Sequence, residues 1–261
     1  DEAGSGDEAG SGDEVGSGDD SRDTGRSGGD SRPWVRIGAL VTHSQIEKST
    51  ELYKRALLLC EASAEIGSPQ IRNRGTLGGN ICNASACADT IPPLITLGAQ
   101  LTIHSVRGKR HLLLEDAIPA PYETVLADDE ILTAASFPSL ATGAGSAFVK
   151  LGRRKALSIS RMSIAVVLER DHSGNLRRVR IAAGSVTPTV QRFHSIENLL
   201  SGKAPSAALF ASAGKALATE MIRISGRRWS TPYKEPVVAA LLRRALVRAT
   251  GNELLKDLVE R

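Results

Sequence analysis

Three glycines within five residues, Gly75, Gly78 and Gly79, constrain this chain more than any other feature. Glycine has no Cβ, so the backbone there can turn tightly and can approach a ligand closely. Successive backbone N–H groups in such a turn can form a concave site for an anion. One interpretation is a loop that binds a phosphate or pyrophosphate, with Asp89 bonding a sugar hydroxyl. The alternative is a connection that needs positive φ angles, and the spacing alone does not separate the two.

Several other chemistries find no support in the sequence. The glycines do not fit the dinucleotide fingerprint G-x-G-x-x-G, and no Lys-Ser or Lys-Thr pair follows Gly79 as in a P-loop. Cys60, Cys82 and Cys87 are odd in number and have no histidine at ligand spacing, which predicts reduced thiols and no metal site. No acid, base or nucleophile stands in a catalytic pattern, so we assign no catalytic residue.

The first 32 residues form an acidic repeat with a period of six, Asp-Glu-Ala-Gly-Ser-Gly. Such a segment buries too little apolar surface to offset its chain entropy, so we predict that it is disordered. It holds ten acidic residues and three arginines; since the whole chain carries a net charge of +4, the remainder carries +11. A basic body is typical of nucleic-acid-binding proteins. Here aromatic residues are few and the basic residues are scattered, which favours solvated faces or an acidic partner subunit and no nucleic acid.

No apolar run reaches the ~20 residues that a membrane helix needs. The acidic N-terminus resembles neither a secretory signal nor a transit peptide. We therefore expect a cytoplasmic protein that does not contact a membrane.

Apolar periodicity predicts an α+β chain of two domains. The expected strands are 34–40, 100–106, 110–114, 131–137, 163–170 and 177–186, and the expected helices are 43–47, 52–66, 90–97, 196–200, 207–222 and 236–249. The stretch 139–145, rich in Ala, Gly and Thr, is the best boundary. The expected organisation is an acidic tail (1–32), a first domain (33–140), a second domain (145–252) and a short tail (253–261).

The glycine stretch belongs to a longer motif, Ile-Arg-Asn-Arg-Gly-Thr-Leu-Gly-Gly-Asn-Ile-Cys-Asn-Ala-Ser from Ile71, followed by Ala-Asp-Thr-Ile-Pro-Pro from Ala88. Together with the segments 146–154 and 184–189, it resembles the FAD-binding medium subunit of the molybdenum hydroxylases, the xanthine dehydrogenase and carbon monoxide dehydrogenase family. The resemblance implies the second lobe of a PCMH-type FAD-binding domain, followed by a C-terminal domain of antiparallel sheet and helices. The family's first lobe, with a second Gly-Gly loop, has no counterpart in the sequence.

The resemblance also implies which residues contact FAD. The loop that meets the pyrophosphate falls on Thr76, Leu77, Gly78, Gly79 and Asn80. The nucleotide contact falls on Asp89, and two flavin neighbours fall on Leu132 and Lys150.

The function implied is that of a flavin subunit in a xanthine dehydrogenase-like oxidoreductase. Electrons would come from 2Fe-2S clusters on a small partner subunit, fed by molybdopterin on a large one, and would pass through FAD to NAD or another acceptor. The alternative is an assembly module that binds no flavin, or a fragment of such a subunit.

Overall fold

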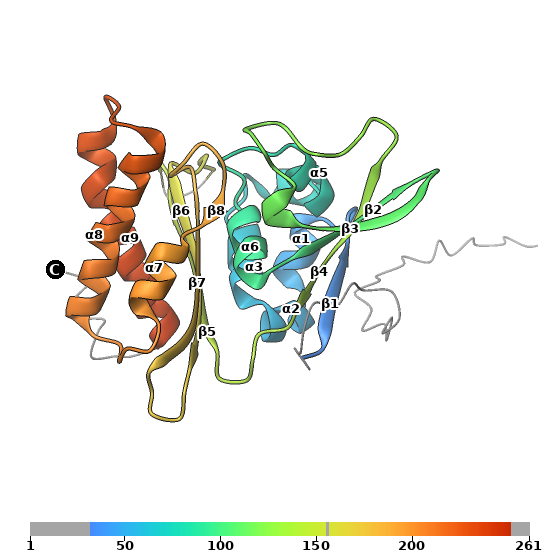
Figure 1. The fold of residues 1–261 in the computed structure, drawn as a ribbon. Coiled ribbons are helices and arrows are strands. Elements are labelled where there is room, and N and C mark those ends of the chain that lie inside the picture. Colours follow the sequence, from blue (N-terminus) through green and yellow to red (C-terminus); the bar gives the residue numbers. More distant parts are fainter. Residues whose placement is uncertain (1–31, 155–156, 252–261) are drawn as a thin grey trace, which may run out of the picture.

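The computed structural model describes residues 32–154 and 157–251. The expected N-terminal tail (1–32) lies outside the described residues except for Arg32, and the expected C-terminal tail (253–261) lies outside them entirely. Helices and antiparallel sheets alternate in four layers (Figure 1). This mixture confirms the α+β class predicted from the sequence.

The first sheet has the order β1-β4-β2-β3 and is antiparallel throughout. Its strands are β1 (Trp34–Gly38), β2 (Gln100–Ser105), β3 (Gly108–Leu113) and β4 (Ile131–Pro138). The expected hairpin is confirmed, since Gln100 pairs with Leu113 and Ser105 pairs with Gly108. A 3-10 turn, η1 (Leu114–Asp116), follows β3.

Short helices lie between the two sheets (Figure 1). They are α1 (His43–Lys48), α2 (Thr50–Arg55), α3 (Leu57–Ala64), α4 (Pro69–Arg74), α5 (Leu77–Cys82) and α6 (Ile91–Leu97). The prediction of one helix over 52–66 is wrong, because the backbone breaks at Ala56, which has φ −156°. The carbonyl of Arg55 accepts a hydrogen bond from the backbone N–H of Leu140 at 2.9 Å, so a contact distant in sequence uses the group at the break.

The second sheet is an antiparallel meander in the order β5-β6-β7-β8. Its strands are β5 (Gly145–Leu151), β6 (Met162–Arg170), β7 (Leu176–Gly184) and β8 (Gln191–Arg192). The helices α7 (His194–Leu200), α8 (Ala207–Ser225) and α9 (Thr231–Thr250) cover its outer face (Figure 1). Helix α9 begins five residues before the predicted start at Pro236, because Pro232 takes the first turn, where proline is tolerated.

The second sheet is buried on both faces. Val166 and Leu168 of β6 belong to a core shared with α7, α8 and α9. Ala165 and Val167, which point the other way, belong to the core of the first half of the chain. Apolar packing therefore joins the two halves, and this contact fixes the position of any site between them. None of the helices in the described residues is long and apolar enough to cross a membrane.

Candidate functional site

The glycine stretch is helical rather than an open loop. Gly75 is the C-cap of α4 with φ −68°, and Gly78 and Gly79 lie in α5. Positive φ angles occur at none of these three glycines, so the alternative that required them is wrong. Thr76 is the N-cap of α5, and its hydroxyl accepts a hydrogen bond from the N–H of Gly79 at 3.1 Å.

Two backbone N–H groups of the stretch are bonded within the protein. Leu77 donates to the carbonyl of Val41 at 2.9 Å, and Gly78 donates to the carbonyl of Ala39 at 2.8 Å. The row of free N–H groups predicted for anion binding is therefore not formed at these positions. A ligand at this edge would instead meet side chains and the bare backbone of Gly79.

Gly78 and Gly79 have different reasons to be glycine. A Cβ on Gly78 would lie 2.7 Å from the Cβ of Ala39 and 2.8 Å from its carbonyl oxygen, so protein packing forbids any side chain. A Cβ on Gly79 would meet only the Thr76 hydroxyl, at 3.1 Å, and Gly79 is exposed. The backbone of Gly79 thus offers an open surface that a ligand can approach closely.

The side chain of Asn80 is held through its oxygen, which leaves its amide N–H groups available as donors. Its Oδ1 accepts a hydrogen bond from the hydroxyl of Thr90 at 2.6 Å. Thr90 is fully buried, so this bond fixes the carboxamide beside Gly79. Within the described residues the Nδ2 group has no protein acceptor, and its N–H groups are available to an anionic oxygen.

Asp89 and Lys150 bond each other. The ammonium of Lys150 donates to Oδ2 of Asp89 at 2.7 Å and to the carbonyl of Glu65 at 2.8 Å. Both side chains are more than nine-tenths buried. The sequence predicted each as a separate ligand contact, but it did not indicate that they would form one pair across the two halves of the chain.

Opposing effects act on the pKa of the Asp89 carboxyl. Burial raises its pKa above the ordinary value of 3.8, while the Lys150 charge and hydrogen bond and the nearby Ser160 hydroxyl act in the opposite direction. Oδ1 of Asp89 is buried and has no hydrogen-bond partner within the described residues. A buried, unpaired carboxylate oxygen is costly, and the Ser160 hydroxyl, which is buried and also has no partner within the described residues, or a ligand hydroxyl can supply the missing hydrogen bond.

Leu132 lies apart from these polar groups. It pairs with Ile103 across β4 and β2, and its side chain is buried in the first core. Helix α5 packs against β4, which brings the glycine stretch near this strand. Any ligand contact at Leu132 would therefore use its backbone rather than an exposed side chain, and its predicted role stays a prediction.

A basic cavity of about 640 Å³ adjoins Lys150. It is lined by four cationic residues from distant parts of the chain, Arg72, Lys150, Arg153 and Arg154. Arg72 is held by Glu47 at 2.8 Å, so its position is fixed. Arg72 and the Arg153–Arg154 pair were not predicted as site residues, although the pair follows Lys150 closely in the chain.

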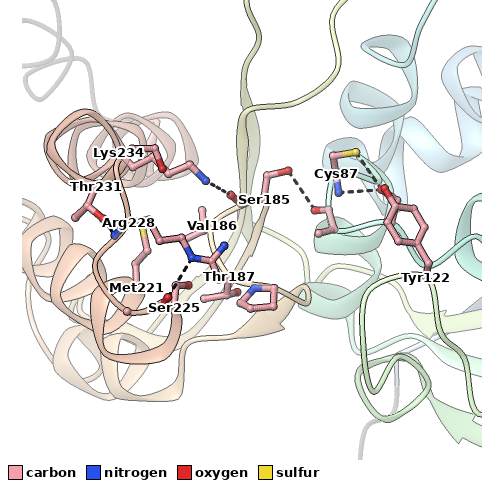
Figure 2. Close-up of a pocket in the computed structure, with 15 residues that line it drawn as sticks. Cys87, Tyr122, Ser185, Val186, Thr187, Met221, Ser225, Arg228, Thr231 and Lys234 are labelled. Carbon is pink, nitrogen blue, oxygen red and sulfur yellow. Dashed lines mark hydrogen bonds between the residues drawn. The ribbon is translucent and has the colours of Figure 1, made fainter.

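A second cavity, of about 310 Å³, lies between the two halves of the chain (Figure 2). Tyr122 and Cys87 line one side, and Arg228 and Lys234 from the α8–α9 region line the other. The Lys234 ammonium donates to the carbonyl of Ser185 at 2.9 Å. Burial, together with the positive charges of Arg228 and Arg161, lowers the pKa of Lys234.

The cations around this second cavity lack acidic partners. Within the described part of the chain, no carboxylate lies within 4.0 Å of the charged atoms of Arg161, Arg228 or Lys234. Arg161 instead lies over the ring of Tyr233, 5.5 Å from its centroid. Arg228 and Lys234 line the cavity, and these two positive charges, neither ion-paired to a carboxylate among the described residues, favour an anionic ligand.

A buried histidine, His43, packs against Gly75 of the glycine stretch. His43 is buried, its backbone N–H donates to the carbonyl of Gly75 at 3.0 Å, and a Cβ on Gly75 would lie 3.1 Å from its ring. Burial, and to a lesser extent the charge of Arg72, lowers its pKa to about 4. His43 is therefore a neutral packing residue at physiological pH.

The described residues contain no group of three or more His, Cys, Asp or Glu side chains that could hold a metal ion. Cys60, Cys82 and Cys87 are free thiols. Burial raises the pKa of Cys60 to about 11 and raises that of Cys82, so both are poor thiolates at neutral pH.

Two family models match consecutive parts of the chain. Residues 30–140 match the FAD binding domain in molybdopterin dehydrogenase, and residues 147–249 match the CO dehydrogenase flavoprotein C-terminal domain.

Curated relatives are similar to well over half of this chain. The nicotine 6-hydroxylase medium subunit of Paenarthrobacter nicotinovorans is 35% identical over 216 residues, which cover 83% of this chain and 75% of that protein. The putative xanthine dehydrogenase FAD-binding subunit of Escherichia coli is 37% identical over 164 residues, covering 62% of this chain and 56% of that protein.

Solved structures agree. The carbon monoxide dehydrogenase of Hydrogenophaga pseudoflava superposes with a TM-score of 0.77 at 29% identity, covering 87% of this chain and 77% of the other. Quinoline 2-oxidoreductase of Pseudomonas putida 86 gives 0.76 at 25% identity, with coverage of 85% and 77%. These matches confirm the resemblance inferred from the motif.

Proposed function

The chain belongs to the family of FAD-binding medium subunits of the molybdenum hydroxylases, and on that premise we propose that it passes electrons from iron–sulfur clusters of a partner subunit, through FAD, to NAD or another acceptor. The small iron–sulfur subunit and the large molybdopterin subunit are the proposed partners, in the cytoplasm. Residues 33–140 and 145–252 are the proposed domains.

The residues present fit FAD at the glycine stretch. The single observation that carries this assignment is the exposed, bare backbone of Gly79 beside the unengaged carboxamide N–H groups of Asn80. Gly79 permits close approach of a pyrophosphate, and Asn80 can donate to its oxygens. Thr76 and Gly78 then act indirectly, because they shape the turn that presents Gly79.

Asp89 and Lys150 fit the hydroxyl-rich part of the same cofactor. The unpartnered Oδ1 of Asp89 can accept a hydrogen bond from a sugar or ribityl hydroxyl. Lys150 uses two of its three N–H donors within the protein, which leaves one for the ligand. When bound, FAD supplies the redox chemistry, and the protein positions it and tunes its surroundings.

The cavity in Figure 2 supports an anionic acceptor. NAD carries a pyrophosphate, and Arg228 and Lys234 supply positive charge, since neither is ion-paired to a carboxylate within 4.0 Å in the described part of the chain. The hydroxyls of Tyr122 and Ser185 can orient the acceptor by hydrogen bonds. We infer that this cavity, rather than a dinucleotide fingerprint, receives the acceptor.

An anaerobic reduction experiment tests the proposal. The chain is purified with its partner subunits, the complex is reduced chemically, and NAD is added while flavin absorbance and NADH fluorescence are followed. We expect the flavin to become oxidised as NADH appears, with at least one NADH formed per flavin because the reduced partner centres also pass their electrons through FAD. A reduced flavin that persists with NAD but is oxidised by a neutral quinone would overturn NAD as the acceptor while preserving the flavin role.

A further inference from the structure

β5 is an edge strand, yet its outward backbone groups at Phe148 are bonded. The second sheet begins with β5, so this side of the strand has no neighbouring strand. Oε2 of Glu61 accepts a hydrogen bond from the Phe148 N–H at 3.0 Å. Arg248 donates to the Phe148 carbonyl, also at 3.0 Å. A carboxylate and a guanidinium thus take the place of a partner strand.

The same two side chains also bond each other. Arg248 donates to Oε1 of Glu61 at 2.8 Å, which closes a ring of three contacts among α3, β5 and α9. These elements come from both family domains, and Arg248 is 187 positions from Glu61. The ring therefore links α3 and α9 to the free edge of β5 at Phe148.

Lys150 depends on that same alignment. Its ammonium donates to the carbonyl of Glu65, which is the C-cap of α3 and lies four residues after Glu61, while Lys150 is two residues after Phe148 on β5. A rise of four helical residues is about 6 Å, and a rise of two strand residues is about 6.6 Å. The spacing from Glu61 to Glu65 therefore matches the spacing from Phe148 to Lys150. The ring at Phe148 thus sets where the next outward residue of β5, Lys150, meets the end of α3.

We propose that Glu61 and Arg248 are positioning residues for Lys150, which they hold against Asp89 at the edge of the flavin site. The inference deepens the proposed function and rests on it for the role of FAD. Loss of the ring lets β5 slide relative to α3, and both contacts of the Lys150 ammonium then lengthen together. Asp89 keeps its buried position but loses a well-placed cation.

The test compares Glu61→Gln, Arg248→Met and a matched control, Glu220→Gln, which breaks an exposed ion pair with Arg223 on α8. In the flavin-free full chain, acylation of Lys150 by an amine reagent is followed by mass spectrometry. We expect faster labelling of Lys150 in the first two variants and wild-type labelling in the control. Unchanged labelling in both ring variants would overturn the proposal, whether or not FAD binds.

A second measurement separates positioning from general destabilisation. FAD affinity of the complex is measured for Glu61→Gln alone and in a Lys150→Met background. One charge-assisted hydrogen bond corresponds to roughly tenfold in affinity, so we expect about a tenfold loss for the single variant. In the Lys150→Met background we expect no further loss. An equal loss in both backgrounds would show that Glu61 acts only on the fold.

Failure of the proposed function gives a different result. If the wild-type complex binds no FAD, the affinity comparison has no baseline, whereas the Lys150 labelling experiment still gives a positive or negative answer about the ring.

Discussion

The ammonium of Lys150 on β5 lies 2.7 Å from Oδ2 of Asp89, which precedes α6, and this buried ion pair links the two halves of the molecule. Both residues were inferred from the sequence as separate cofactor contacts. Their pairing means that the protein already compensates the charge of each before any ligand arrives. A ligand can therefore add to the pair, through Oδ1 of Asp89 and the third N–H of Lys150, without first burying a lone charge.

Removal of the Lys150 ammonium should destabilise the fold, because the buried carboxylate of Asp89 loses its ion-pair partner. We expect Lys150→Met to lower the free energy of unfolding by about 3 kcal/mol at neutral pH, because a buried charge is left without its partner. Chemical denaturation measures the change. The double variant Lys150→Met/Asp89→Asn is the control and should recover most of the loss.

The same variant should show a defined pH dependence. Burial raises the folded-state pKa of Asp89 above 3.8. An acid with a raised pKa stabilises the fold while protonated, and that contribution is lost as the pH rises through the folded pKa. Without Lys150 the pKa rises further, so the deficit of Lys150→Met should be small below about pH 4 and should grow toward neutrality. A deficit that is constant across this range would argue against the pair.

His43 predicts a pH effect of the opposite sign. Its pKa falls from 6.5 to about 4 on folding, so the folded state disfavours the proton. Stability is then complete above pH 6.5 and declines as the pH falls toward 4, at up to about 1.4 kcal/mol per pH unit. Denaturation of the wild type and of His43→Gln between these limits tests this, since the variant should lack the slope.

The two neighbouring glycines should respond differently to a methyl group. Gly79→Ala should fold with near-normal stability but lose most of its FAD affinity, because the added Cβ meets only the Thr76 hydroxyl, at 3.1 Å, and otherwise occupies the exposed face. Gly78→Ala should instead destabilise the fold by about 1–3 kcal/mol through overpacking against Ala39. Thermal unfolding and FAD titration of both variants provide the comparison. Full FAD affinity in a folded Gly79→Ala protein would show that FAD does not contact the backbone of Gly79.

The acceptor cavity makes a kinetic prediction. Lys234→Gln should raise the KM for NAD several-fold, because one positive charge at the cavity is lost, and should leave turnover with a neutral quinone unchanged. Lys203→Gln, a change at an exposed lysine in the α7–α8 turn, is the matched control. Equal effects of Lys234→Gln on NAD and quinone would contradict an electrostatic role.

Sequence patterns predicted the strands and the long C-terminal helices because these depend on local periodicity. The β2–β3 hairpin follows from alternation on either side of Gly108, and Gly98, at φ +73°, ends α6 as a left-handed C-cap. The motif that begins at Ile71 was specific enough to identify the family.

Contacts between distant segments were beyond the reach of the sequence. The sequence favours a loop at Gly78 and Gly79 because glycine lets the backbone turn tightly, but the bonds of Leu77 to Val41 and of Gly78 to Ala39 anchor this stretch as α5. The break at Ala56 depends on Leu140, far along the chain. The bonds from Glu61 to Phe148 and from Lys150 to Asp89 span 87 and 61 positions, and no local pattern records such distances.

The FAD content of the complex purified with its partner subunits tests the central claim most directly. The flavin is released by denaturation and quantified against the amount of this chain, in the wild type and in Gly79→Ala. We predict equimolar FAD in the wild type and a large loss in a variant that still assembles. A wild-type complex that assembles fully without FAD would contradict the account.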